Sequence, residues 1–308
     1  MSAELKGASF SGHESFPFRY TWLTKGVSRS QQNPGIFNDD SAMAILGVGK
    51  NMVRSIRHWC MAAKLIEETQ RNRSGSVQPT ALGQHIFLGD DAWDPYLEDI
   101  GTLWLIHWLI ATNREKATAW YFAFNHIHQP EFSRDGLEHA LLDLMKRHMN
   151  IRVSQNTVKR DVEVFIRTYT AARNTQYKLL EETLDCPLIE LNLIRATKDA
   201  GTYVFNRGYQ DALDNALFLY AVLDFAEPQI NNQTTISFEE ISYGDRSPGK
   251  VFKIDETSMG ERLEQIESLS HGSILFSETA GLKQLLFKRP VDKMDILKKY
   301  YEKAKRGR

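Results

Sequence analysis

The sequence predicts a mainly α-helical protein with small β elements, an α+β fold, and two observations support that prediction. Apolar residues recur at helical spacing through most of the chain, whereas strand-like runs between turn residues are short and few. The length of 308 residues favours two or three domains. We expect an N-terminal winged helix-turn-helix domain over 1–90, a helical domain with a second candidate helix-turn-helix over 91–175, and an acidic α/β domain with short strands and a basic tail over 176–308.

Charge is distributed unevenly along the chain, although the formal net charge is only −1. Lys and Arg outnumber Asp and Glu by ten to six over 1–80, by seven to two over 144–173 and by seven to three over 291–308. Over 174–247 the balance reverses to five against twelve. Basic faces attract polyanions because phosphate binding releases counterions. Solvated helix surfaces explain such segments equally well.

The composition does not indicate a secreted or membrane protein. The N-terminus lacks the basic-then-apolar pattern of a signal peptide. The most apolar run, 100–111, is shorter than the roughly 20 residues that span a bilayer. The two cysteines, Cys60 and Cys186, form neither a disulfide framework nor a CxxC metal site. We therefore expect a cytoplasmic protein.

The run GHESFPFRYTWLTKG at 12–26 is dense in aromatic and ionisable side chains. The serine before Phe-Pro predicts the start of a helix and Lys-Gly its end, with a loop over 28–38. His13 suits a general base or phosphate ligand because imidazole titrates near neutral pH, and Glu14 suits orienting it or binding a metal. These two are the catalytic candidates, and Arg19 and Lys25 are candidate phosphate ligands. The alternative is a packed N-terminal helix that His13 and Glu14 cap.

Residues 39–64 predict a helix-turn-helix. Asp39, Asp40 and Ser41 can cap a short helix, GVG at 47–49 turns the chain, and a second helix runs from about 50 to 64. Such a unit places the start of its second helix in the major groove of DNA. The side chains predicted to face DNA are Lys50, Asn51, Arg54, Ser55, Arg57 and His58.

The residues that follow predict a wing. LIEETQ reads as a strand, RNRSGS as a flexible basic tip and SVQPT as a return strand, and a further helix begins near Thr80. Arg71 and Arg73 at the tip would contact backbone phosphate. The GVGK sequence does not complete a nucleotide-binding P-loop, because Ala44 stands at the first glycine position and Asn51 at the Ser/Thr position.

Residues 133–173 repeat this pattern. Ser133 precedes one predicted helix and Ser154 another, whose valines and aromatic residues form a single apolar stripe. The opposite side of that helix adds four DNA-binding candidates: Asn156, Lys159, Arg160 and Arg167. The solvated face of an ordinary bundle helix explains these four residues as well.

The remaining segments yield no metal site by spacing. Residues 96–125 predict one or two core helices, and the two histidines of HIH at 126–128 lack a third ligand nearby. Later runs TTISFEEI, GKVFKID and GSILF read as strands, and the end reads as two short helices with a basic tail. A nuclease would need convergent carboxylates for Mg²⁺ or Mn²⁺. The acidic block offers Asp185, Glu190, Asp211, Asp214, Asp224, Glu239 and Glu240, of which Asp211 and Asp214 would share a helix face.

Four stretches together resemble one bacterial family: FSGHESFPFRYTWLTKG, LDCPLIELNLI, SPGKVFKID and SETAGLKQLLF. They are similar to the SspB-like family, a domain of unknown function that accompanies operons for DNA phosphorothioate modification in phage defence. The resemblance covers nearly the whole chain. It implies a DNA-binding protein that nicks the backbone for sulfur insertion, with a cysteine desulfurase, sulfur-transfer proteins and ATPases as partners. The resemblance does not identify any residue of this sequence as catalytic.

The sequence therefore leads to two hypotheses and a weaker third. The first is a nickase of double-stranded DNA in a phosphorothioation system, dependent on a divalent metal, with a homodimer as one assembly. The second is a non-catalytic winged-helix adapter or transcriptional regulator, which the missing catalytic motif favours. The third is a helical scaffold, for which DNA binding would be absent or independent of salt.

Overall fold

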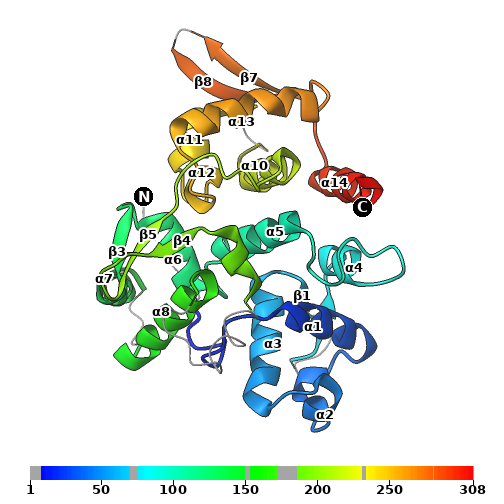
Figure 1. Cartoon of the computed structure of the whole chain (residues 1–308). Coiled ribbons are helices and arrows are strands. Elements are labelled where there is room, and N and C mark those ends of the chain that lie inside the picture. The colour runs from blue at the N-terminus through cyan, green and yellow to red at the C-terminus, as the bar shows by residue number, and fades with distance from the viewer. Residues whose placement is uncertain are drawn as a thin grey trace. The chain divides into compact units, whose positions relative to one another are not determined.

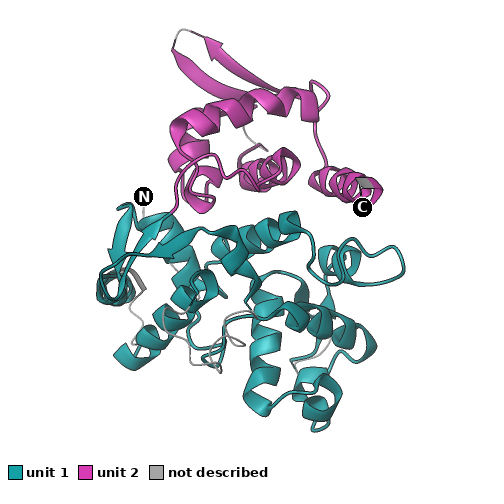
Figure 2. Ribbon diagram, in the orientation of Figure 1, with its two compact units in different colours: residues 1–205 teal, residues 206–308 magenta. Residues whose placement is uncertain are grey.

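The chain folds into two compact units, residues 1–205 and residues 206–308 (Figure 2). The structure is a computed structural model and describes residues 8–69, 75–149, 153–171, 186–230, 234–279 and 281–307. Helices dominate these residues and the sheets are small and antiparallel, which confirms the α+β class. The finer division into domains at 90 and 175 stays a prediction. No helix in the described ranges has the length and apolar character needed to cross a membrane.

The first unit (Figure 1) is built from helices and two small sheets. Its helices are α1 (Tyr20–Gln32), η1 (Ile36–Asn38), α2 (Ala42–Leu46), α3 (Lys50–Ala62), α4 (Ala81–Phe87), α5 (Ile100–Ala111), α6 (Thr118–His126), α7 (Arg134–Leu144), η2 (Met145–Met149), α8 (Gln155–Tyr169) and η3 (Pro187–Leu191). Its strands are β1 (Ile66–Glu68), β2 (Val77–Pro79), β3 (Glu131–Ser133), β4 (Ile194–Ala196) and β5 (Thr202–Phe205). Strand β1 pairs with β2, and β5 lies between β3 and β4.

The second unit places helices beside one three-stranded sheet of order β6-β8-β7. Its elements are α10 (Asn215–Ile230), β6 (Thr235–Ser237), α11 (Phe238–Tyr243), α12 (Pro248–Val251), α13 (Glu256–Leu269), β7 (Ile274–Thr279), β8 (Leu282–Phe287) and α14 (Lys293–Gly307). Helix α10 packs against α13 and α14. The buried Arg262 of α13 holds the loop before α10, donating to the carbonyl oxygens of Tyr209 and Gln210 and to the side-chain oxygen of Asn215.

Helix α1 begins and ends later than the sequence indicated. It runs from Tyr20 to Gln32, so it starts after the predicted serine, passes through Gly26 and occupies part of the expected loop. Gly26 does not end the helix; it allows close packing between helices. A Cβ atom at Gly26 would lie 2.3 Å from Sγ of Cys60 on α3 and 3.0 Å from Ile56. The glycine therefore allows α1 to lie close against α3.

The order predicted for residues 39–87 is present in the described residues. Helix α2 ends at Gly47, which has φ of +68°, the left-handed conformation that glycine adopts readily. Helix α3 follows, then the β1–β2 pair, and Thr80 caps α4 by accepting a hydrogen bond from the backbone N–H of Gly83. Arg71 and Arg73 lie outside the described residues. The winged-helix interpretation of these elements stays a prediction.

The core of the first unit surrounds α5 and α6, as the apolar run predicted. Helix α5 is buried on every side, which explains why its sequence shows no polar face. Trp104, Trp108 and Trp120 are each 1% exposed. Ser133 and Ser154 cap α7 and α8 by accepting from Gly136 and Thr157, so both predicted helix starts are confirmed.

Two predictions for the second unit are wrong. The run LKQLLF forms strand β8, not a helix, because it pairs with both β6 and β7 and buries Leu285 and Phe287 between them. The run SPGKVFKID contains the short helix α12, not a strand. Ser247 caps that helix, and Gly249 fits closely against α11, since a Cβ there would lie 2.4 Å from the carbonyl oxygen of Ser242.

Candidate nucleic-acid interface

A turn at residues 11–15 connects the first halves of α3 and α8 (Figure 1). The backbone N–H of Ser11 donates to Oδ1 of Asp161 on α8 at 2.8 Å. The hydroxyl of Ser55 on α3 donates to the carbonyl oxygen of His13 at 2.9 Å. One five-residue turn therefore fixes two helices that are far apart in the sequence.

His13 lies at the centre of this connection and is fully buried, with 0% exposure. Its Nδ1 accepts a hydrogen bond from the backbone N–H of Ser15 at 3.2 Å, which places the imidazole proton on Nε2. That nitrogen lies 3.2 Å from Oδ1 of Asp161, at an angle outside ordinary hydrogen-bond geometry, so the contact is chiefly electrostatic. The ring also stacks on Trp59 and meets Trp120 edge-on.

The backbone of the turn is unusual. Ser11, Glu14 and Ser15 have φ of 61°, 49° and 68°, the left-handed region that residues other than glycine rarely adopt. Each such residue costs roughly 1–3 kcal/mol and persists where the surroundings fix it. Clusters of this kind occur at functional sites. The strain therefore supports a functional role for the run that the sequence singled out.

The structure separates the residues predicted on α3 into two groups. Lys50, Asn51 and Arg54 are exposed near its start. Arg54 makes an ion pair with Glu14 of the turn, 3.4 Å between Nη1 and Oε1, with about half of the arginine side chain exposed (55%). Arg57 pairs with Glu68 at the end of β1, at 3.0 Å.

Ser55 and His58, predicted to face DNA, instead face the protein. Ser55 is buried and its hydroxyl is used by His13. The ring of His58 meets His13 and Trp59 edge-on, and its Nε2 is buried without a hydrogen-bond partner. Burial, with further contributions from His13, Lys116 and Arg57, lowers the pKa of His58 from 6.5 to about 3, so the ring is neutral. A helical projection could not show this, because the 11–15 turn covers a face that appears polar in the sequence.

Helix α8 presents three basic side chains and Asn156 on one face, on which the half-buried Glu163 also lies. Asn156, Lys159, Arg160 and Arg167 are all exposed, as predicted, while the apolar stripe of the helix is buried. Asp161 lies inside that stripe and is 2% exposed. It follows Val158 by three residues and precedes Phe165 by four, and this spacing places an acid on the buried side. The spacing is thus a signal in the sequence for a buried acid, and the structure shows that His13 is its neighbour.

Of the predicted phosphate ligands, Arg19 directly precedes α1 and Lys25 lies in its first half. The ammonium group of Lys25 donates to the carbonyl oxygen of Leu46 at 3.1 Å, where it balances the negative C-terminal end of α2. The guanidinium group of Arg19 lies 5.4 Å from the centre of the Trp22 ring. Both side chains are half-buried, so each has a structural role besides any contact with phosphate.

Among the described residues, the carboxylates of the acidic block do not gather into one site, and Asp185 lies outside the described residues. Asp211 and Asp214 precede α10 and do not share a helix face, which corrects that expectation. Asp224 and Glu227 of α10 pair with Lys293. His126, one of the two histidines considered as metal ligands, stacks on Phe122. Among the described residues, no group of three or more His, Cys, Asp or Glu side chains is placed to hold a metal ion.

Comparison with known proteins gives one consistent result. The family model described as "Protein of unknown function (DUF4007)" matches residues 10–301. A solved structure described as "Magnesium ion-bound SspB crystal structure" is 30% identical, with a TM-score of 0.89, over 98% of this chain and 91% of the other. One described as "SspB crystal structure" is also 30% identical, with a TM-score of 0.87, over 97% of this chain and 91% of the other. None of the curated proteins matches the chain. The chain belongs to the SspB-like family, which the DUF4007 family model describes.

Proposed function

We propose that this protein binds double-stranded DNA through the exposed starts of α3 and α8 and serves a DNA phosphorothioation system. The observation that supports this function most directly is the 11–15 turn. Through His13, it fixes the starts of two basic helices relative to each other. Two recognition-like helices held in one orientation form a single surface that a duplex can contact.

The charge on this surface fits a polyanion. Lys50 and Arg54 lie at the start of α3, and Lys159 and Arg160 lie at the start of α8. Long basic side chains at such positions contact phosphate oxygens and release counterions from DNA. Asn51 and Asn156 beside them suit hydrogen bonds to base edges, adenine above all. In this proposal Ser55, His58, His13 and Asp161 position the surface and do not contact DNA.

Membership of the SspB-like family supports the phosphorothioation context. A cysteine desulfurase, sulfur-transfer proteins and ATPases are the partners that this context supplies. They would act on DNA that the α3–α8 surface holds.

The test is the affinity of a fluorescently labelled duplex, measured by anisotropy. Lys50→Ala/Arg54→Ala and Lys159→Ala/Arg160→Ala should each weaken binding by about tenfold or more, because each removes two phosphate contacts. Lys288→Ala/Arg289→Ala, which removes two exposed charges from the second unit, is the matched control and should bind as the parent does. Unchanged affinity in both α3 and α8 variants would reject the DNA-binding proposal.

Nicking is the finer part of the proposal, and a magnesium-bound relative supports it. The described residues do not gather a set of metal ligands, so we derive no step through a metal. Glu14 is the carboxylate at the DNA-facing end of the turn, and its side chain is 30% exposed. Mg²⁺ usually binds one or two carboxylates together with substrate phosphates, which makes Glu14 the residue to test.

Supercoiled plasmid distinguishes a nickase from an adapter. In Mg²⁺ or Mn²⁺, with the pathway partners present, the nickase proposal predicts conversion of plasmid to the open circular form. Glu14→Gln should abolish that conversion while duplex affinity is retained. Intact plasmid with normal duplex binding would establish the non-catalytic adapter instead.

A further inference from the structure

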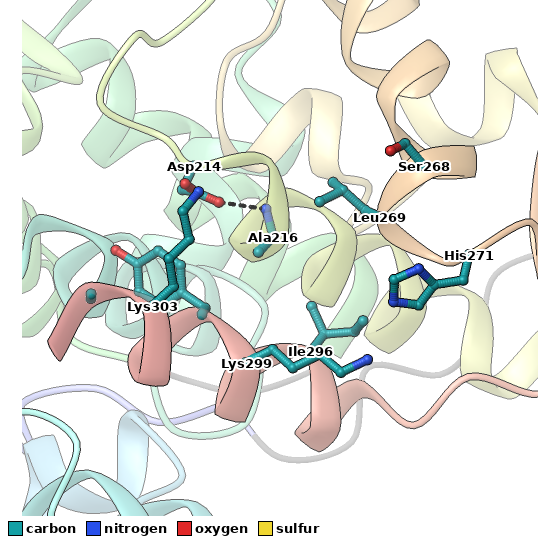
Figure 3. A pocket seen from close by; sticks show the side chains of 10 residues that line it. Asp214, Ala216, Ser268, Leu269, His271, Ile296, Lys299 and Lys303 are labelled. Carbon is teal, nitrogen blue, oxygen red and sulfur yellow. Dashed lines mark hydrogen bonds between the residues drawn. The ribbon is translucent and has the colours of Figure 1, made fainter. Parts of the chain in front are cut away.

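The second unit contains a pocket that the DNA-binding surface does not use. Its volume is about 450 Å³, within the range typical of small-molecule sites. It lies between the start of α10, the end of α13 and one face of α14 (Figure 3). All residues that line it belong to residues 206–308, so the pocket belongs to one compact unit.

The floor of the pocket is apolar. Leu269 of α13 and Ile296 of α14 border the same space (Figure 3), and Ala216 and Ala304 also line the pocket. Tyr300 contributes an aromatic ring to the same wall. This surface suits a flat apolar body such as a nucleobase, which gains free energy both from burial and from contact with an aromatic side chain.

The rim carries two kinds of polar group on opposite sides. In Figure 3, Lys299 extends toward His271 on one side, and Asp214 and Lys303 lie on the other. Within the described ranges neither Lys299 nor Lys303 makes an ion pair, whereas Lys293 of the same helix pairs with Asp224 and Glu227. One carboxylate oxygen of Asp214 accepts from the backbone N–H of Ala216 at 2.7 Å, which leaves the other available to a ligand donor.

We propose that this pocket binds a nucleotide. The base would lie on Leu269, Ile296 and Tyr300. The phosphate would meet Lys299 and His271, which donate hydrogen bonds and attract negative charge. Asp214 would accept from a sugar hydroxyl or a base amino group, a role that acidic residues fill in other nucleotide sites. A simple anion would leave the apolar floor unused, and an apolar molecule would leave the rim unsatisfied.

The nucleotide has two sources, a free nucleotide or one base of a single DNA strand. The first probe pair is AMP and adenosine, with binding measured by calorimetry on the full chain. The parent should bind AMP about tenfold more tightly than adenosine, because the Lys299 ammonium group adds a charge-assisted hydrogen bond to the phosphate. Lys299→Ala should remove that preference. Lys298→Ala, an exposed neighbour on α14 that does not line the pocket, should preserve it.

A variant that fills the pocket distinguishes binding inside it from binding to a basic surface. Ala304→Trp occupies the space and leaves every charged side chain in place, so it should abolish binding of both probes. The second arm uses a short single-stranded oligonucleotide. Binding of the oligonucleotide but not of AMP, sensitive to Ala304→Trp, identifies the strand as the source.

The proposal is overturned if neither AMP nor the oligonucleotide binds, or if binding survives Ala304→Trp in a folded variant. A circular dichroism melt of each variant shows whether it is folded. This inference does not depend on the proposed function. The α3 and α8 variants of the first unit should bind AMP as the parent does. Loss of duplex binding in these variants therefore does not affect the calorimetric test of the pocket.

Discussion

At the scale of single residues, the histidine next to the basic face of α3 packs against the protein with its Nε2 buried. His58 follows Arg57 in the sequence, and a helical wheel places it on the polar side. The structure turns it against His13 and Trp59. The sequence could not predict this, because the segment that covers His58 lies some 45 residues earlier and is held there by tertiary contacts.

The neutral His58 predicts a pH dependence of stability. Its pKa is lowered to about 3 in the folded chain and is about 6.5 when unfolded, so between these values the unfolded chain binds the extra proton. Stability should therefore be retained above pH 6.5 and decrease as the pH falls below it, by up to about 1.4 kcal/mol per pH unit from this residue. Urea denaturation at pH 7.5, 6 and 5 measures the slope.

The control for that slope is His58→Gln, which cannot titrate. This variant should show a shallower decrease between pH 6.5 and 5 than the parent, even if it is less stable at every pH. Equal slopes in the two proteins would contradict the assignment of a buried neutral imidazole at position 58.

Asp161 gives a second prediction at this scale. It accepts from the backbone N–H of Ser11 and contacts Nε2 of His13, both in the buried interior. Asp161→Asn should lower the free energy of unfolding by about 1–3 kcal/mol, because a buried charge-assisted network loses one partner. Glu163→Gln, two residues along on the same helix and only half-buried, should change it by less than about 0.5 kcal/mol. A thermal or urea melt that ranks the two variants in the reverse order would contradict the bridging role of the turn.

At the scale of elements, the sequence predicted those helices and strands that are determined by residues close to them along the chain. The serine and threonine caps of α4, α7 and α8 and the order from α2 to β2 follow from local signals. Helix α1 and strand β8 did not, because their limits depend on distant partners. From the sequence, Gly26 predicts the end of a helix, whereas the structure shows that it allows close packing against Cys60. The run LKQLLF predicts a helix, whereas the structure pairs it with β6 and β7 as a strand.

Two glycines test that reasoning as a matched pair. Gly26→Ala should destabilise the protein by about 1–3 kcal/mol, because its Cβ would lie 2.3 Å from Sγ of Cys60. Gly260→Ala, in the interior of α13 with no atom within 4 Å of the new Cβ, should stabilise it by about 0.5–1 kcal/mol. Melting temperatures measure both. A harmless Gly26→Ala would mean that α1 and α3 do not pack as closely as described.

At the scale of the whole molecule, the sequence indicated the family and most of the residues of the proposed DNA-binding surface. Exposed positions on α8 followed from helical periodicity alone, and the family followed from four motifs spread over the chain. Sequence reasoning missed the link between the surface and the opening motif. His13 was considered as a catalyst, and the structure instead buries it between α3 and α8. The sequence also gave no indication of the pocket in the second unit, whose lining residues come from three helices and are spread from Asp214 to Ala304.

The central claim is that α3 and α8 contact one duplex together, and the salt dependence of binding tests it most directly. The logarithm of the affinity for a labelled duplex is measured against the logarithm of salt concentration for the parent, for Lys50→Ala/Arg54→Ala, for Lys159→Ala/Arg160→Ala and for the combined variant. Each lost phosphate contact should reduce the slope by about 1, so each pair should lower it by about 2 and the combination by about 4. A parent slope near zero, or a combined variant that keeps the parent slope and affinity, would contradict the account.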